Sequence, residues 1–150
     1  MKPVECYSYF EIRSDGYVDF DEGYIASPNS DFSIEYITEK LGIKPHQTMK
    51  MGNIRESGIG KYPLTKWIFQ PEPEADDPTQ CISIVRALKE KIPLLQEIYK
   101  EFNVNFSIQV VAHVVGGETV PCFGFNDEII EFCYLTHTDI GLEFNTYNKE

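Results

Sequence analysis

The segment from Val104 to Val114 constrains the fold more than any other part of this sequence. Apolar side chains occupy every second position, at Val104, Phe106, Ile108, Val110, Ala112 and Val114. The positions between them are Asn105, Ser107, Gln109, Val111 and His113. A period of two is that of a β-strand, and the mixture of apolar and polar positions indicates that one face is buried. We therefore expect a sheet with a covered face and a more polar face.

Helical patterns precede and follow this strand. Residues 81–102 place apolar side chains three or four positions apart, which predicts a helix with one buried face. Pro93 must kink this helix or divide it in two, because proline cannot donate the backbone hydrogen bond of a helix interior. Asp77 is a good N-cap residue, which predicts that the helix begins at Pro78. After the strand, Asn126 is expected to cap a further helix.

The first half of the chain predicts shorter elements. A strand is expected at 6–13, where Phe10 and its alternate neighbours face one way and Tyr7, Tyr9 and Glu11 face the other. Residues 17–30 are expected to form a long loop, in which 17–20 can add a short strand. A helix is expected at 34–41, with Ser33 as its N-cap and Gly42 as the left-handed residue that ends it.

The order of these elements predicts the fold class. Further strands are expected at 47–51, 62–69, 119–125 and around 140–144. Trp67 would be a core anchor on the second of these strands. At 150 residues the chain predicts a single α+β domain, 1–150, in which a mostly antiparallel or mixed sheet packs against two or three helices. Strand–helix–strand units occur in both halves, which leaves an internal duplication open.

The composition favours an acidic protein of the cytoplasm. The 24 acidic and 13 basic residues give a net charge of −11, which disfavours binding to DNA or RNA. No apolar run approaches the ~20 residues of a membrane span. The four cysteines, Cys6, Cys81, Cys122 and Cys133, are dispersed without a C-x-x-C pair or a secretory signal. This usage indicates reduced thiols.

A short motif suggests a family. The stretch Leu41-Gly42-Ile43-Lys44-Pro45 is followed by Thr48, Lys50 and Gly52, by Trp67 on a strand, and by a C-terminal helix–strand unit with Asp139. In this pattern the chain resembles the bacterial family of domain of unknown function 4279, over residues 7–147. The resemblance implies an α+β fold and residence in the bacterial cytoplasm, without an established activity. Members of such families are suspected to be immunity proteins encoded beside toxins, which implies a protein-binding role.

Acidic segments are the candidate surface for such a role. We expect a non-enzymatic protein-binding module whose partner is a basic protein, such as a toxin. The expected contacts are Tyr17, Phe20, Asp21 and Glu22 in the long loop, and Glu72, Glu74, Asp76 and Asp77 in an arm stiffened by prolines. No histidine stands beside Cys81 in a catalytic motif, and the acids of residues 15–22 lack the spacing of a calcium loop. We therefore expect neither catalytic residues, a cofactor nor a metal site.

A basic segment supports an alternative. Residues 44–66 contain five basic side chains and one acidic one, a charge of +4, interleaved with glycines. Lys44, Lys50, Arg55 and Lys61 would line a site for phosphate or carboxylate in a small-molecule or anion-binding domain, which could be an enzyme. The standard phosphate-binding motifs are absent, and a solvated hairpin loop is the competing interpretation. A homodimer closed through aromatic side chains is a third hypothesis.

Overall fold

The computed structural model describes residues 5–73, 80–116 and 124–147. The strands are β1 (Glu5–Ser14), β2 (Gly16–Asp19), β3 (Gly23–Ala26), β4 (Gln47–Met49), β5 (Lys66–Phe69), β6 (Val104–Val115) and β7 (Thr138–Tyr147). The helices are α1 (Ile34–Leu41), α2 (Cys81–Leu88), the 3₁₀ turn η1 (Lys89–Lys91), α3 (Ile92–Glu101) and α4 (Asp127–Thr136). The predicted α+β class is confirmed.

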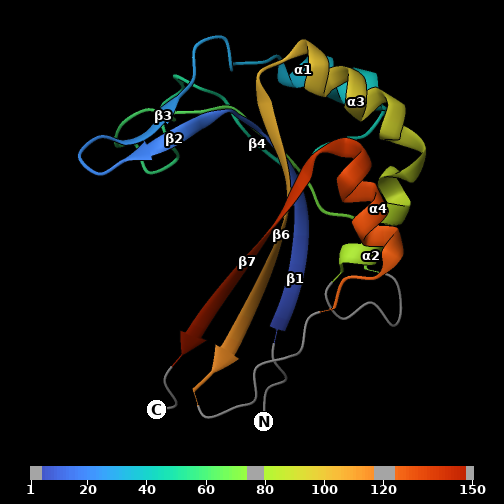
Figure 1. Ribbon diagram of the computed structural model, residues 1–150. Helices are drawn as coiled ribbons and strands as arrows, with labels where there is room; N and C mark the ends of the chain where they lie inside the picture. The colour runs from blue at the N-terminus through green and yellow to red at the C-terminus, as the bar shows by residue number, and fades with distance from the viewer. Residues whose placement is uncertain (1–4, 74–79, 117–123, 148–150) are drawn as a thin grey trace.

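The main sheet is mixed, as predicted. Its five strands lie in the order β4-β5-β1-β6-β7, and β2 and β3 form a separate hairpin. Strand β1 runs antiparallel to both β5 and β6, and β4 runs antiparallel to β5. Strands β6 and β7 are parallel, and α4 lies between them in the chain. The helices of the described residues lie on one side of this sheet, while the hairpin projects away from its other side (Figure 1).

The core lies between the sheet and these helices. The register of β1 and β6 pairs Phe10 with Ile108 and Ile12 with Phe106, and all four side chains are fully buried. They pack with apolar side chains of the helices, namely Ile37, Leu41, Ile84, Leu88, Leu95, Ile98 and Phe132. Trp67 is completely buried beside them, and its indole N–H donates a hydrogen bond to Thr38 Oγ1 at 3.1 Å. Its predicted role as a core anchor is confirmed.

Two of the predicted helix starts are confirmed by their capping bonds. Ser33 Oγ accepts a hydrogen bond from the Tyr36 N–H at 3.1 Å at the start of α1. Asn126 Oδ1 accepts one from the Ile129 N–H at 3.0 Å at the start of α4. Gly42 follows α1 in the left-handed conformation, as its position predicted.

The start of the second helix differs from the prediction. Helix α2 begins at Cys81, and Gln80 has a left-handed backbone with φ 64°. The prediction that Gln80 is part of this helix is therefore wrong. Asp77 and Pro78 lie outside the described residues. Of the two outcomes predicted for Pro93, a kink or a division, the structure shows a division: η1 separates α2 from α3. Pro93 stands in the first turn of α3, where its missing N–H costs nothing.

Some strand predictions need correction. Strand β4 ends at Met49 and β5 begins only at Lys66, because the glycine-bearing segment between them forms turns. The expected loop 17–30 contains β3 as well as β2. Most of the strand expected at 119–125 falls outside the described residues, and its last two residues, Gly124 and Phe125, are not in a strand.

None of the helices in the described part of the chain combines the length and the apolar character needed to span a membrane. Cys81 is fully buried on the apolar side of α2, and its Sγ lies 3.3 Å from Ser8 Oγ. The sequence interpretation of Cys81 as a packed side chain is therefore confirmed.

We predict that removing the cap of α1 weakens the fold. Ser33→Ala leaves the Tyr36 N–H without its acceptor, so the free energy of unfolding should fall by about 1 kcal/mol. Glu39→Ala, at an exposed position of the same helix, is the matched control and should change stability much less. Urea unfolding followed by circular dichroism measures both. Equal stabilities of Ser33→Ala and the control would contradict the capping assignment.

Candidate functional site

One face of the main sheet carries none of the described helices (Figure 1). We call it the open face. It consists of the alternate positions that point away from the core, including Tyr7, Tyr9, Glu11 and Arg13 of β1, Lys66 and Ile68 of β5, and Ser107, Gln109 and His113 of β6. The sheet register places Tyr9 opposite Gln109 and Glu11 opposite Ser107. Polar and aromatic side chains are therefore collected on a surface that the described helices leave uncovered.

A buried carboxylate lies at the centre of the open face. Glu11 is only 2% exposed, although none of the described helices lies on its face of the sheet. Arg13 Nη1 lies 3.7 Å from Glu11 Oε1, and Lys66 Nζ lies 3.6 Å from Glu11 Oε2. Ser107 Oγ donates a hydrogen bond to Glu11 Oε1 at 3.1 Å, and Gln109 Nε2 donates one to Ser107 Oγ at 3.0 Å. Two cations, Arg13 and Lys66, thus share this buried carboxylate.

This network is not fully satisfied by hydrogen bonds. Glu11 Oε2 and Arg13 Nε are buried and have no hydrogen-bond partner among the described residues. A buried polar group without a hydrogen-bond partner lowers the stability of the fold, so another interaction must offset this cost. For Glu11 Oε2 that interaction is the charge of Lys66, whose side chain is partly exposed at the surface of the open face.

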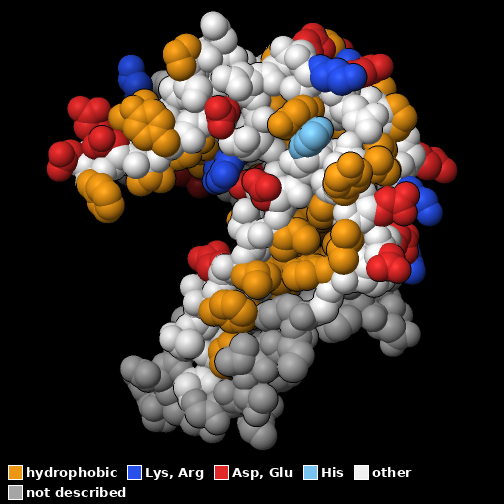
Figure 2. Space-filling model, viewed as in Figure 1, with side chains coloured by type: hydrophobic (Ala, Val, Ile, Leu, Met, Phe, Trp, Pro, Cys, Tyr) orange, Lys and Arg blue, Asp and Glu red, His pale blue; other side chains and the backbone are white. Residues whose placement is uncertain are grey.

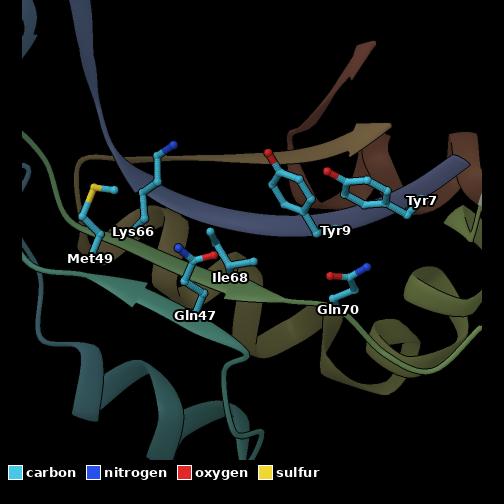
Figure 3. Close-up of a pocket in the computed structure, with 7 residues that line it drawn as sticks. All are labelled: Tyr7, Tyr9, Gln47, Met49, Lys66, Ile68 and Gln70. Carbon is cyan, nitrogen blue, oxygen red and sulfur yellow. The ribbon is translucent and has the colours of Figure 1, made fainter. Parts of the chain in front are cut away.

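A pocket of about 580 Å³ adjoins this network. It is lined by Tyr7, Tyr9, Gln47, Met49, Lys66, Ile68 and Gln70. These residues come from β1, β4 and β5 and the residue after β5, so three adjacent strands build the pocket. In Figure 3 the polar ends of Tyr9 and Lys66 rise from the sheet on the same side. The volume is within the range of small-molecule sites.

The second candidate surface is the β2–β3 hairpin. Tyr17, Val18 and Phe20 are exposed, and Phe20 has no significant contact with the rest of the structure because its side chain is fully accessible to solvent. Asp21 and Glu22 are exposed beside them. Figure 2 shows hydrophobic and acidic side chains gathered at the projecting end of the molecule where the hairpin lies in Figure 1. Exposed apolar side chains concentrated on one projection are typical of a contact surface for another protein.

The hairpin is fixed to the sheet at its base. Tyr24 Oη donates a hydrogen bond to the Ser14 carbonyl at 2.7 Å, and the Ser27 N–H donates one to the Asp15 carbonyl at 2.7 Å. Asn105 Nδ2 of β6 donates to Asp15 Oδ1 at 2.7 Å. A Cβ atom on Gly16 would lie 2.3 Å from the Ile25 carbonyl oxygen, so the close pairing of β2 and β3 requires glycine there. These contacts fix the orientation of the hairpin relative to the sheet.

The tip of the hairpin is also ordered. Asp19 Oδ1 accepts hydrogen bonds from the backbone N–H groups of Asp21 at 2.8 Å and Glu22 at 3.0 Å. This carboxylate therefore stabilises the turn between the two strands. The described residues contain no group of three or more His, Cys, Asp or Glu side chains placed to hold a metal ion.

The structure brings together half of the predicted partner contacts. Tyr17, Phe20, Asp21 and Glu22 all lie on the hairpin. Glu72 is exposed in the segment after β5, and Glu74, Asp76 and Asp77 lie outside the described residues. The open-face residues Tyr9, Glu11 and Lys66 were not among the predicted contacts.

The four basic residues of the alternative site have different surroundings. Lys50 Nζ donates hydrogen bonds to Asp31 Oδ1 at 2.9 Å and to the Phe32 carbonyl at 2.8 Å. Burial tends to raise the pKa of Asp31, but hydrogen bonds from Thr65 and Lys50 outweigh it and hold that pKa below its ordinary value. Lys50 is therefore engaged within the fold.

The other three basic residues, Lys44, Arg55 and Lys61, form no ion pair with an acidic side chain of the described residues. Arg55 and Lys61 are neighbours, because Arg55 Nε donates to the Lys61 carbonyl at 3.2 Å. Lys44 is exposed before β4. An anion site built from this segment stays a prediction, as does a homodimer.

The thiol of Cys133 is a weak nucleophile at neutral pH. Burial raises its pKa to about 11, with smaller contributions from Cys81 and Asp139. The thiolate, not the thiol, is the reactive species, and it is scarce several pH units below the pKa.

His137, at the end of α4, stacks on Tyr99 with ring centroids 4.6 Å apart.

The profile described as Domain of unknown function (DUF4279) matches residues 4–149, nearly the whole chain. The chain belongs to this family. The resemblance inferred from residues 41–52 and Trp67 is thereby confirmed, while the family itself carries no assigned function. No curated protein and no solved structure matches the chain significantly.

We predict that the charge of Glu11 stabilises this DUF4279 domain. Glu11→Gln keeps the shape of the side chain but leaves Arg13 and Lys66 as neighbouring cations without a shared carboxylate. The free energy of unfolding should fall by about 1.5–3 kcal/mol, the range for hydrogen bonds to charged groups. Glu143→Gln, at an exposed position of β7 on the same face, should be nearly neutral. Unfolding in guanidinium measures the stability of both variants. Equal losses of stability for Glu11→Gln and Glu143→Gln would contradict a stabilising role for the charge of Glu11.

The raised pKa of Cys133 predicts a loss of stability at high pH. The thiol titrates near pH 9.0 in the unfolded chain and near 11 in the fold. Its contribution to stability is therefore complete below pH 9.0 and lost as the pH rises towards 11, because deprotonation then favours the unfolded chain. Wild type should lose more stability than Cys133→Ala over this interval in parallel unfolding titrations. Identical pH profiles would show that the thiol is not perturbed.

Proposed function

We propose that this DUF4279 protein is a non-enzymatic protein-binding module that presents the β2–β3 hairpin to a basic partner. The observation that carries the proposal is the fully exposed Phe20 on an acidic projection. An aromatic side chain that no part of its own fold covers is suited to enter a pocket of another protein. The acidic side chains around it suit a partner of opposite charge.

The geometry of the hairpin favours tight binding. Its base is fixed by Tyr24 and Ser27 and its turn by Asp19, so little conformational entropy is lost when a partner binds. Asp19, Asp21 and Glu22 are the charged residues between Gly16 and Ala26, which gives the hairpin a charge of −3. The net charge of −11 adds long-range attraction for a basic protein and increases the rate of encounter.

The class of partner that suits this surface is a basic toxin, for example a nuclease. An acidic protein that covers the cationic substrate-binding surface of such an enzyme would neutralise it without any chemistry of its own. In this proposal the chain is an immunity protein of the bacterial cytoplasm. The proposal requires one partner, a stoichiometric complex and binding that weakens as salt screens the charges.

We predict that a photoreactive residue at the hairpin tip captures the partner. Benzoylphenylalanine in place of Phe20 should cross-link to one basic protein when the full chain is expressed in its native host. The same residue in place of Tyr134, which is exposed on α4, is the matched control and should not capture that protein. Mass spectrometry identifies the adducts.

A charge reversal then tests the electrostatic part of the proposal. Asp21→Lys with Glu22→Lys should slow association with the purified partner at least tenfold at low salt, and the difference should shrink at high salt. Glu39→Lys with Glu131→Lys, at exposed positions of α1 and α4, is a control with the same change in net charge. Equal capture from Phe20 and Tyr134, or equal rates for the two double variants, would contradict binding through the hairpin.

A further inference from the structure

The pocket on the open face is distinct from the hairpin tip and has no role in the proposed protein contact. Its wall contains five side chains with polar ends, Tyr7, Tyr9, Gln47, Lys66 and Gln70. Within the described part of the chain, none of these side chains makes a hydrogen bond, and the polar end of Lys66 has only its ion pair with Glu11 at 3.6 Å. The pocket therefore offers uncommitted donors to a ligand.

The charge of the pocket favours an anion. Lys66 is the charged residue among those that line it, and Glu11 lies behind Lys66 as a buried carboxylate. Because Arg13 also pairs with Glu11, one carboxylate faces two cations. The ammonium group of Lys66 thus keeps attraction for a second anion. Glu143 lies on the same face and acts on Tyr9, so the attraction for an anion comes from Lys66 itself and not from an excess of positive charge on the open face.

Tyr9 supplies a hydrogen-bond donor to the same pocket. Burial raises the pKa of its phenol, and Glu11 and Glu143 raise it further, so the hydroxyl stays protonated. Figure 3 shows the Tyr9 hydroxyl and the Lys66 ammonium group extending to the same side of the sheet. A carboxylate can accept from both groups, since hydrogen bonds to an ionised acceptor are stronger than neutral ones.

The rest of the lining suits an apolar body. Tyr7 and Tyr9 stack with ring centroids 6.5 Å apart and planes inclined by 27°, and Met49 and Ile68 add apolar side chains. Phosphate groups are usually held by several cations or by a row of backbone N–H groups, and the lining contains one lysine and no glycine. A single negative charge on a flat organic molecule matches this wall better.

We propose that the open-face pocket binds a small organic carboxylate with an aromatic body. Its carboxylate accepts hydrogen bonds from Lys66 and Tyr9, and its ring lies against Tyr7, Met49 and Ile68. The amide groups of Gln47 and Gln70 meet polar substituents of the ring. Glu11 is a positioning residue, because it holds the Lys66 side chain from behind without touching the ligand.

Titration of the ¹⁵N-labelled full chain with benzoate and with 3-phenylpropionate tests this site. The backbone signals of residues 7–9, 47–49 and 66–70 should shift in a saturable way with at least one of the two acids. Benzyl alcohol and benzylamine, which keep the ring but lack the negative charge, should bind at least tenfold more weakly. Inorganic phosphate, which has the charge but no ring, should also bind at least tenfold more weakly.

Matched variants locate the contacts. Tyr9→Phe removes one hydroxyl and should lower the affinity for the acid about tenfold, as expected for a hydrogen bond to a charged group. Lys66→Met should lower this affinity more, whereas Lys44→Met, at an exposed lysine outside the pocket, should leave it unchanged. Because Lys66→Met removes a partner of Glu11, the dispersion of the amide signals is used first to check that this variant is folded. If Lys66→Met is unfolded, the affinity of Tyr9→Phe decides whether the acid binds in the pocket.

Three results would overturn the proposal. The first is an absence of saturable shifts with both acids at their solubility limits. The second is equal affinity for benzyl alcohol and the acids, which would remove the carboxylate from the recognition. The third is unchanged affinity of Tyr9→Phe together with shifts centred away from β1, β4 and β5. None of these results bears on the hairpin, so the protein-binding proposal is tested independently.

Discussion

The antiparallel pairing of β1 with β6 is the constraint on which the rest of the structure depends. It joins the first strand of the domain to a strand almost a hundred residues later, over all ten residues of β1. Because side chains alternate along a strand, this single register puts Phe10 and Ile108 against the helices and Glu11 and Ser107 on the open face. A slip of one residue would place the charged network in the core, at a large desolvation cost.

The two faces created by this register have different physical characters. The helix side is closed by apolar packing around Trp67 and Phe106, and its stability comes from the area removed from water. The open face contains Glu11, whose burial is tolerated because Arg13, Lys66 and Ser107 surround it. The same arrangement leaves Lys66 attractive to an anion. The hairpin, fixed to the end of β1, places a second surface beyond the sheet, so the two proposed binding surfaces are separate parts of one scaffold.

Local sequence signals predicted the local structure well and the site poorly. Ser33 and Asn126 marked helix starts because a cap is a contact between residues three apart, and the alternation of 104–114 marked β6. The alternation around Phe10 also assigned Tyr9 and Glu11 to the far face of β1. The approach of Lys66 to Glu11 depends on strand order, which no local pattern encodes. The left-handed Gln80 was missed because its conformation contradicts an otherwise good helix-start pattern.

Backbone NOEs across β1 and β6 test the central claim most directly, because both binding surfaces depend on this register. In isotope-labelled protein, an antiparallel pair brings either the two α protons or the two amide protons of opposite residues close together. The account predicts cross-strand NOEs that join Glu11 to Ser107 and Phe10 to Ile108. A pattern displaced by one residue, joining Glu11 to Ile108, would contradict the placement of Glu11 and Tyr9 on the open face.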